Sequence, residues 1–134
     1  MISFKILKFI LALCFIININ ASCLPGQYKC SYSYSNGCCD CPSGTYSPDG
    51  FECINCPPGT YSSFSGSKSC NYCEPGSFTN IPGSSFCMRC NAGTHAPDYG
   101  SSFCYDCPYG AWSNPGSSHC YQMHYNYDYN YYYR

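Results

Sequence analysis

Apolar residues along this chain gather near its N-terminal end. The run "FILALCFII", residues 9–17, is continuously apolar, and Lys5 and Lys8 precede it. A charged start, a short apolar run and a small residue such as Ala21 form the layout of a secretory signal peptide. We therefore expect residues 1–21 to be a signal peptide. An uncleaved membrane anchor is the alternative, although the run is shorter than the roughly 20 residues that cross a bilayer.

Beyond residue 22 the pattern changes, because Leu24, Ile54 and Ile81 are the only large aliphatic residues there. No amphipathic helix can be written on such a pattern. Turn-forming residues leave short segments between them, and these favour short, irregular strands. A chain so poor in apolar residues cannot offset its conformational entropy by burial alone. We expect a small disulfide-rich fold of short β-hairpins, with almost no helix in the mature chain.

The rest of the chain is repetitive. The segment "CINCPPGTYSSFSGSKSC" begins at Cys53, and Cys56, Cys73, Cys90 and Cys107 follow one another at intervals of 17 residues. A short fixed period is typical of a linear array of modules. We therefore expect an elongated tandem array of cysteine-rich modules. Its parts are a divergent first module at 22–40, repeats at 41–53, 56–70, 73–87, 90–104 and 107–120, and a tail rich in tyrosine and asparagine at 121–134.

Each module has a turn glycine followed by a large ring. In "PPGTY" the glycine is Gly59, which permits the positive φ of a tight turn. We call the ring position two residues later the aromatic slot. We expect the slot ring to cover the disulfide of its module, because little else in the module could form a core. The slot residues are Tyr28, Tyr46, Tyr61, Phe78, His95 and Trp112.

The number of cysteines predicts a disulfide framework. Of the 15 cysteines, Cys14 lies in the expected signal peptide, and the remaining 14 can pair completely. Their density is well above the ~8–10% that marks a disulfide scaffold. The simplest pairing closes each loop on itself, and an interleaved pattern that joins Cys53 to Cys70 is the alternative. The simplest set is Cys23–Cys38, Cys30–Cys39, Cys41–Cys53, Cys56–Cys70, Cys73–Cys87, Cys90–Cys104 and Cys107–Cys120.

Two other chemistries fit a C-x2-C pair. The pairs Cys53–Cys56 and Cys70–Cys73 have a spacing close to that of a zinc ribbon. One argument against zinc is that a signal peptide directs the chain to an oxidising compartment, where thiols form disulfides. The evenly continued series also gives no boundary between four-ligand sites. A thioredoxin-like centre would need a helix N-terminus to activate the thiol, and no helix is expected. We therefore expect neither a metal nor a cofactor.

Charge and histidine content argue against two further classes of function. Without the signal peptide, four basic residues stand against seven acidic ones, which leaves no basic surface for nucleic acid. His95 lies in an aromatic slot, and His119 and His124 flank the last cysteine, so we expect structural or surface roles for them. We expect no enzymatic activity. Since no second apolar run follows, we also expect no transmembrane segment in the mature chain.

The pattern "CxxCPxGTYSxxxGxxxC" resembles the cysteine-rich repeat of ephrin-receptor extracellular regions. It is also similar to the first half-module of tumour necrosis factor receptor repeats, and the start "CLPGQY…CCDC" fits the opening of that family. The resemblance covers residues 23–120. It implies an extended, extracellular, disulfide-rich rod used in recognition or as a spacer, and it carries over no ligand site.

The tail "YQMHYNYDYNYYYR" holds seven tyrosines in 14 residues. Its low complexity is typical of a disordered segment, whereas alternating tyrosine and asparagine also favours self-association. The sequence predicts a secreted, extracellular protein without enzymatic activity. Its partner is an extracellular protein, or a second copy bound through the tail in a matrix or coat. The alternative is a secreted inhibitor or effector that presents one loop to a partner protein.

Overall fold

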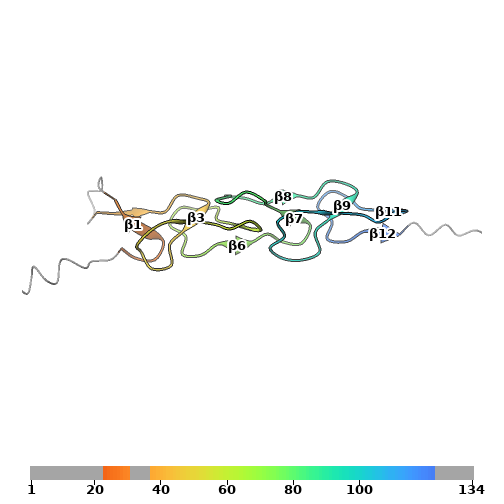
Figure 1. The fold of residues 1–134 in the computed structure, drawn as a ribbon. Coiled ribbons are helices and arrows are strands. Elements are labelled where there is room, and N and C mark those ends of the chain that lie inside the picture. Colours follow the sequence, from red (N-terminus) through yellow and green to blue (C-terminus); the bar gives the residue numbers. More distant parts are fainter. Residues whose placement is uncertain (1–22, 31–36, 123–134) are drawn as a thin grey trace, which may run out of the picture.

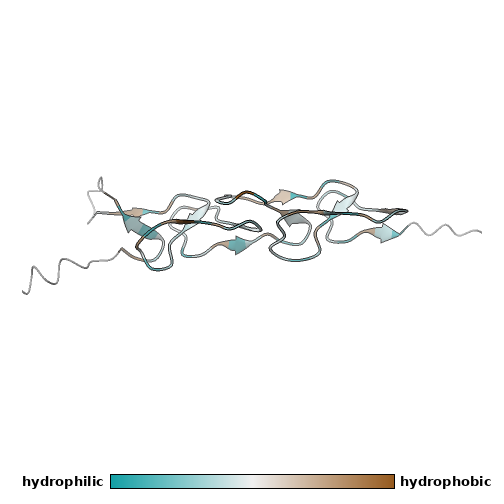
Figure 2. Ribbon diagram, viewed as in Figure 1, coloured by the Kyte–Doolittle hydropathy of each residue, from teal (hydrophilic) through white to brown (hydrophobic). Residues whose placement is uncertain are grey.

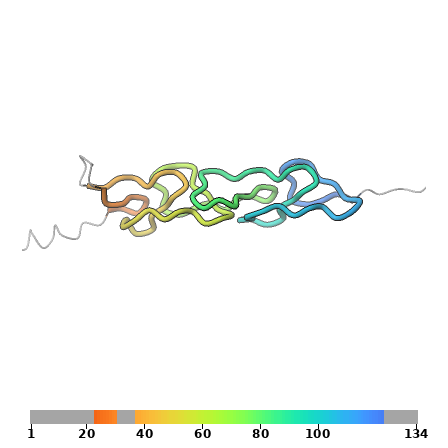
Figure 3. The backbone as a smooth tube through the Cα atoms, turned by 45° about the horizontal axis from the view of Figure 1, so that its top comes forward, coloured from red at the N-terminus to blue at the C-terminus, as the bar shows by residue number. Residues whose placement is uncertain are grey.

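The computed structural model of the chain describes residues 23–30 and 37–122. These residues form an elongated rod in which successive modules follow one another along the axis (Figures 1 and 3). The predicted signal peptide, and the predicted tail beyond Gln122, lie outside the described residues. Within the described part, no helix is long and apolar enough to serve as a membrane span.

Regular structure in the described part consists of six two-stranded antiparallel sheets and no helix. This confirms the predicted class of a small disulfide-rich fold of short hairpins. The strand pairs are β1 (Gln27–Lys29) with β2 (Cys38–Asp40), β3 (Thr45–Tyr46) with β4 (Ile54–Asn55), β5 (Thr60–Tyr61) with β6 (Asn71–Tyr72), β7 (Ser77–Phe78) with β8 (Met88–Arg89), β9 (Thr94–His95) with β10 (Tyr105–Asp106), and β11 (Ala111–Trp112) with β12 (Tyr121–Gln122).

A tight turn starts each hairpin, and the module at 56–70 illustrates it. The amide of Thr60 donates to the carbonyl of Pro57 at 3.0 Å, and Gly59 between them has a φ of +83°. Proline before a glycine with positive φ is the signature of a type II turn. The hydroxyl of Thr60 also donates to the Pro57 carbonyl, at 2.8 Å. The turn therefore ends just before β5, which leaves room for a strand of only two residues.

Seven disulfides close the modules, and their Cα–Cα distances of 5.5 to 5.8 Å are ordinary for a disulfide. From Cys41 onward each loop is closed on itself, so Cys53 pairs with Cys41 and not with Cys70, whereas the two disulfides of the first module cross. The pairs are Cys23–Cys38, Cys30–Cys39, Cys41–Cys53, Cys56–Cys70, Cys73–Cys87, Cys90–Cys104 and Cys107–Cys120.

The buried interior consists of sulfur and small side chains. Cys41, Cys56, Cys73 and Cys90 are at most 1% exposed. From the module at 41–53 onward, the residue directly after the aromatic slot is buried as well, and these residues are Ser47, Ser62, Thr79, Ala96 and Ser113. Figure 2 accordingly shows hydrophilic and hydrophobic residues interspersed along the rod, without an apolar layer. A continuous hydrophobic core is therefore missing from the described part of the chain.

The slot rings, which we expected to cover the disulfides of their modules, are not part of the buried interior. Tyr46, Tyr61 and Phe78 are only partly buried, and Trp112 is 42% exposed. A strand residue and its successor point to opposite faces, so the small residue after the ring takes the inner position.

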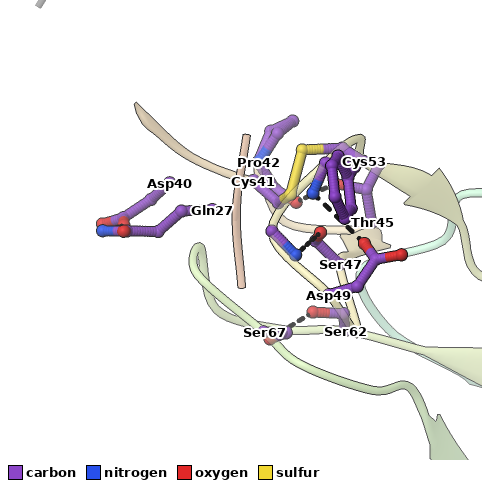
Figure 4. The surroundings of a disulfide bond; sticks show 12 residues. Gln27, Asp40, Cys41, Pro42, Thr45, Ser47, Asp49, Cys53, Ser62 and Ser67 are labelled. Carbon is purple, nitrogen blue, oxygen red and sulfur yellow. Dashed lines mark hydrogen bonds between the residues drawn. A yellow bond between two sulfur atoms is a disulfide. The ribbon is translucent and has the colours of Figure 1, made fainter. Parts of the chain in front are cut away.

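The hydroxyl groups of the buried serines form hydrogen bonds. Around the Cys41–Cys53 disulfide, the hydroxyl of Ser47 accepts the amide of Gly50 at 3.1 Å (Figure 4). The hydroxyl of Ser62 donates to that of Ser67 at 2.7 Å. No buried side-chain nitrogen or oxygen among the described residues is left without a hydrogen-bond partner. The polar interior is therefore satisfied.

Backbone hydrogen bonds join each module to the next. Between the modules at 56–70 and 73–87, Gly59 donates to the Thr79 carbonyl at 2.7 Å, and Cys73 donates back to the Gly59 carbonyl at 2.9 Å. Gly83 donates to the Cys56 carbonyl at 2.8 Å. Equivalent bonds recur at the following module boundaries. The rod is thus a solenoid that its backbone holds together.

Candidate functional site

Large apolar side chains lie on the surface of the rod. Tyr109 is fully exposed, and Phe64 is 78% exposed. Further exposed residues of this kind are Leu24, Phe51, Ile54, Tyr72, Ile81, Phe86, Met88, Tyr99, Phe103, Tyr105, Trp112 and Tyr121. Single exposed apolar residues need no explanation, but grouped ones mark interaction surfaces. The candidate interaction surfaces are therefore the places where several such side chains lie in contact.

The aromatic slot forms part of such a group in the module at 90–104. His95 on β9 is the cross-strand partner of Tyr105 on β10, and their rings lie 5.9 Å apart. The ring of Phe103 lies edge-on to that of Tyr105 at 4.6 Å. The disulfide at Cys104 separates these two rings in the sequence. Three positions, namely the slot and the two neighbours of the closing cysteine, therefore build one surface cluster.

The same three positions build a second cluster in the module at 107–120. Trp112 lies 5.0 Å from its cross-strand partner Tyr121, and the His119 ring lies edge-on to Tyr121 at 4.6 Å. At the module 73–87, the equivalent residues are Phe78, Phe86 and Met88. The two positions beside the closing cysteine were missed in the sequence. Their signal is confined to the last three modules, where Phe86, Phe103 and His119 precede the closing cysteine and Met88, Tyr105 and Tyr121 follow it.

A groove of about 710 Å³ is lined in part by Phe86. Its lining residues come from the modules at 56–70, 73–87 and 107–120, together with Arg89. Tyr61, Phe86 and Pro115 contribute apolar or aromatic surface, while Glu74 and Arg89 contribute one charge of each sign. The side chain of Arg89 lies against Gly116, where a β-carbon would come within 3.3 Å of its Cδ. The stacking of modules thus creates a surface that no single module has.

The histidines make local contacts. The Nδ1 atom of His95 lies 3.2 Å from both the Tyr105 carbonyl and the Cys120 sulfur. The Nδ1 atom of the exposed His119 lies 3.2 Å from the hydroxyl of its half-buried neighbour Ser118. His124 lies outside the described residues.

One group of side chains in the described part has the composition of a metal site. The donor atoms of His95, Cys107 and Cys120 lie within 4.8 Å of one another. Cys107 and Cys120 are joined in a disulfide, however. Because a cysteine ligates metal as a thiolate, the group cannot act as a three-ligand centre while this bond is intact.

The comparison with protein families agrees with this architecture. Residues 44–86 match the family model described as tyrosine-protein kinase ephrin type A/B receptor-like. The matched stretch includes most of the module at 41–53, the whole module at 56–70 and most of the module at 73–87. A search of the curated proteins gives no match. The chain is a cysteine-rich repeat protein with an ephrin-receptor-like segment, whereas the similarity to tumour necrosis factor receptor repeats stays a prediction.

Proposed function

We propose that this chain is a secreted recognition protein without enzymatic activity, and that it binds an extracellular protein along the side of its rod. Disulfides at this density persist in oxidising, extracellular compartments. The ephrin-receptor-like segment is of an extracellular type. The observation that carries the proposal is the groove between Tyr61, Phe86 and Arg89, together with the aromatic clusters downstream of it.

The composition of these surfaces suits a protein partner. Tyrosine, tryptophan and arginine are the residues that most often dominate binding energy in protein interfaces. The groove combines apolar walls with Glu74 and Arg89, so it offers one charge of each sign to a partner segment. Disulfides and module-to-module hydrogen bonds fix the groove before binding. Such preorganisation reduces the entropy that association costs.

A pair of groove substitutions tests the proposal. The full secreted protein would be crosslinked to intact cells and their secreted proteins, once as the wild type and once as the variant Phe86→Ser/Arg89→Glu. The exposed Phe64→Ser change is the matched control, because Phe64 does not line the groove. We expect a partner that the wild type and the control both bind and that the groove variant loses. A partner bound equally by all three proteins would place recognition elsewhere, and the absence of any partner would overturn the proposal.

A structural role in a matrix or coat is the second candidate. It is favoured by exposed tyrosines in the described part, such as Tyr99 and Tyr109, in addition to the tyrosine-rich tail. This candidate predicts self-association, whereas a secreted inhibitor or effector would stay monomeric. Removal of residues 123–134 leaves β12 intact and should abolish the self-association. An unchanged oligomer size by light scattering would exclude a role of the tail.

A further inference from the structure

The disulfide Cys107–Cys120 has a histidine beside it. The Nδ1 atom of His95 lies 3.2 Å from the Cys120 sulfur. His95 belongs to the preceding module, so the contact exists only because the two modules are stacked. In the other modules the slot holds a tyrosine, a phenylalanine or a tryptophan. The adjacent histidine therefore distinguishes this disulfide from those of the other modules.

A second contact determines which nitrogen of His95 carries a proton. Nδ1 lies 3.2 Å from the backbone carbonyl of Tyr105. A carbonyl oxygen only accepts hydrogen bonds, so Nδ1 must be the donor. The Cys120 sulfur lies at the same distance, 3.2 Å, from this nitrogen. A thiolate accepts a hydrogen bond more strongly than a disulfide sulfur does, because it carries the full negative charge.

Cys107 is also more exposed than the cysteines at its position in the preceding modules. Cys41, Cys56, Cys73 and Cys90 open their modules and are at most 1% exposed, whereas Cys107 is only partly buried. The carbonyl of Cys90 accepts a hydrogen bond from Gly116 in the next module. Cys107 accepts no such bond among the described residues, since its module is the last of the described part.

We propose that Cys107–Cys120 is a thiol–disulfide exchange site for low-molecular-weight thiols. A thiolate attacks the Cys107 sulfur, a new S–S bond forms there, and the bond to Cys120 breaks. Cys120 leaves as a thiolate that accepts the hydrogen bond from His95 Nδ1. One thiolate is consumed and one is released, so the step needs no other oxidant or reductant. The better stabilised the leaving thiolate, the faster the exchange.

Exchange at this bond would have a local consequence. Cys120 directly precedes β12, which pairs with β11 in the same module. Loss of the bond removes the covalent closure of this hairpin. The other disulfides, which carry the stacked modules upstream, stay intact. The site thus allows a thiol to modify one end of the rod without unfolding the rest.

Limited exchange with reduced glutathione tests the proposal. The full oxidised protein is treated briefly, free thiols are alkylated, and peptide mass spectrometry measures modification at each cysteine. We expect glutathione on Cys107 and alkylation of Cys120 to appear first, roughly tenfold faster than at Cys73–Cys87. First reaction at any other disulfide, or equal rates at all of them, would overturn the proposal.

Variants at position 95 distinguish the effect of the histidine on the exchange rate from the effect of the exposure of Cys107. His95→Phe keeps a ring that the slot already holds at Phe78, and it should remove most of the rate advantage. His95→Asn keeps an N–H donor close to the position of Nδ1 and should retain part of it. Phe78→His places an imidazole in the equivalent slot upstream and should accelerate exchange at Cys90–Cys104. An undiminished rate in His95→Phe, with all disulfides formed before treatment, would exclude the histidine.

Discussion

Gly59 and Gly100 lie backbone against backbone, although they belong to modules that are not neighbours in the sequence. A β-carbon on Gly59 would come within 2.0 Å of the Gly100 carbonyl oxygen. The same close approach joins Gly26 to Gly66, Gly44 to Gly83 and Gly76 to Gly116. The first four modules therefore each contact both the next module and the module after that. The rod owes its compact cross-section to glycines at these crossings.

The first prediction concerns Gly59→Ala. Its φ of +83° would be strained for alanine by about 1–2 kcal/mol, and the clash with Gly100 adds about 1–3 kcal/mol. Gly110 is a matched control, because its φ is +78° and no atom lies within 4 Å of its hypothetical β-carbon. Gly110→Ala should therefore show the backbone strain alone. Denaturant unfolding of the two oxidised variants measures the difference, and equal losses of stability would contradict the contact between alternate modules.

The contact between alternate modules could not be predicted from the sequence, although much else could. The cysteine and glycine period was sufficient to predict modules, short hairpins and an elongated array. It gave no information on which modules are in contact. A close contact between two backbones requires glycine, but a tight turn requires glycine as well, so the sequence does not distinguish the two. The aromatic slot was expected to cover the disulfide of its module, because little else in the module could form a core. The sequence did not show that the buried position is held by the small residue after the ring, such as Ser62 or Thr79.

The second prediction concerns the small polar interior. Ser62 is 1% exposed and donates to the hydroxyl of Ser67. Ser62→Ala should cost about 1 kcal/mol, since Ala96 already occupies the equivalent position. Ser62→Leu should cost about 1–3 kcal/mol because no space is left for the larger side chain. Thermal unfolding measures both. A more stable leucine variant would mean that the interior accepts apolar bulk.

The third prediction concerns a disulfide in the middle of the rod. Replacement of Cys73 and Cys87 by serine opens a loop with a sequence separation of 14, which should cost about 3 kcal/mol. Cys73 also accepts a backbone hydrogen bond from Gly100 and donates one to Gly59. The neighbouring modules should therefore lose protection in hydrogen exchange.

Replacement of Cys30 and Cys39 is the control for this experiment. Their bond closes a loop within the divergent first module, with a sequence separation of 9. Its loss should leave protection of the modules at 56–70 and 90–104 unchanged. Equal loss of protection in both variants would show that the array unfolds as one unit, and it would contradict an effect limited to the modules next to the opened loop.

The fourth prediction concerns secretion. Cleavage after Ala21 predicts that the protein secreted by expressing cells begins at Ser22, the residue before Cys23. N-terminal sequencing of the secreted material measures this directly. Replacement of apolar residues within 9–17 by charged ones should keep the protein inside the cell. Secretion of the altered chain, or membrane retention of the natural one with residues 1–21 attached, would contradict the prediction.

Cystine takes the place that apolar side chains hold in most small domains, and intact mass combined with thiol counting tests this most directly. Native protein should lack two hydrogens for each of its seven disulfides, should show no reactive thiol, and should lose its fold in strong reductant. Reactive thiols throughout the native chain, in a protein that stays folded under reduction, would contradict the account.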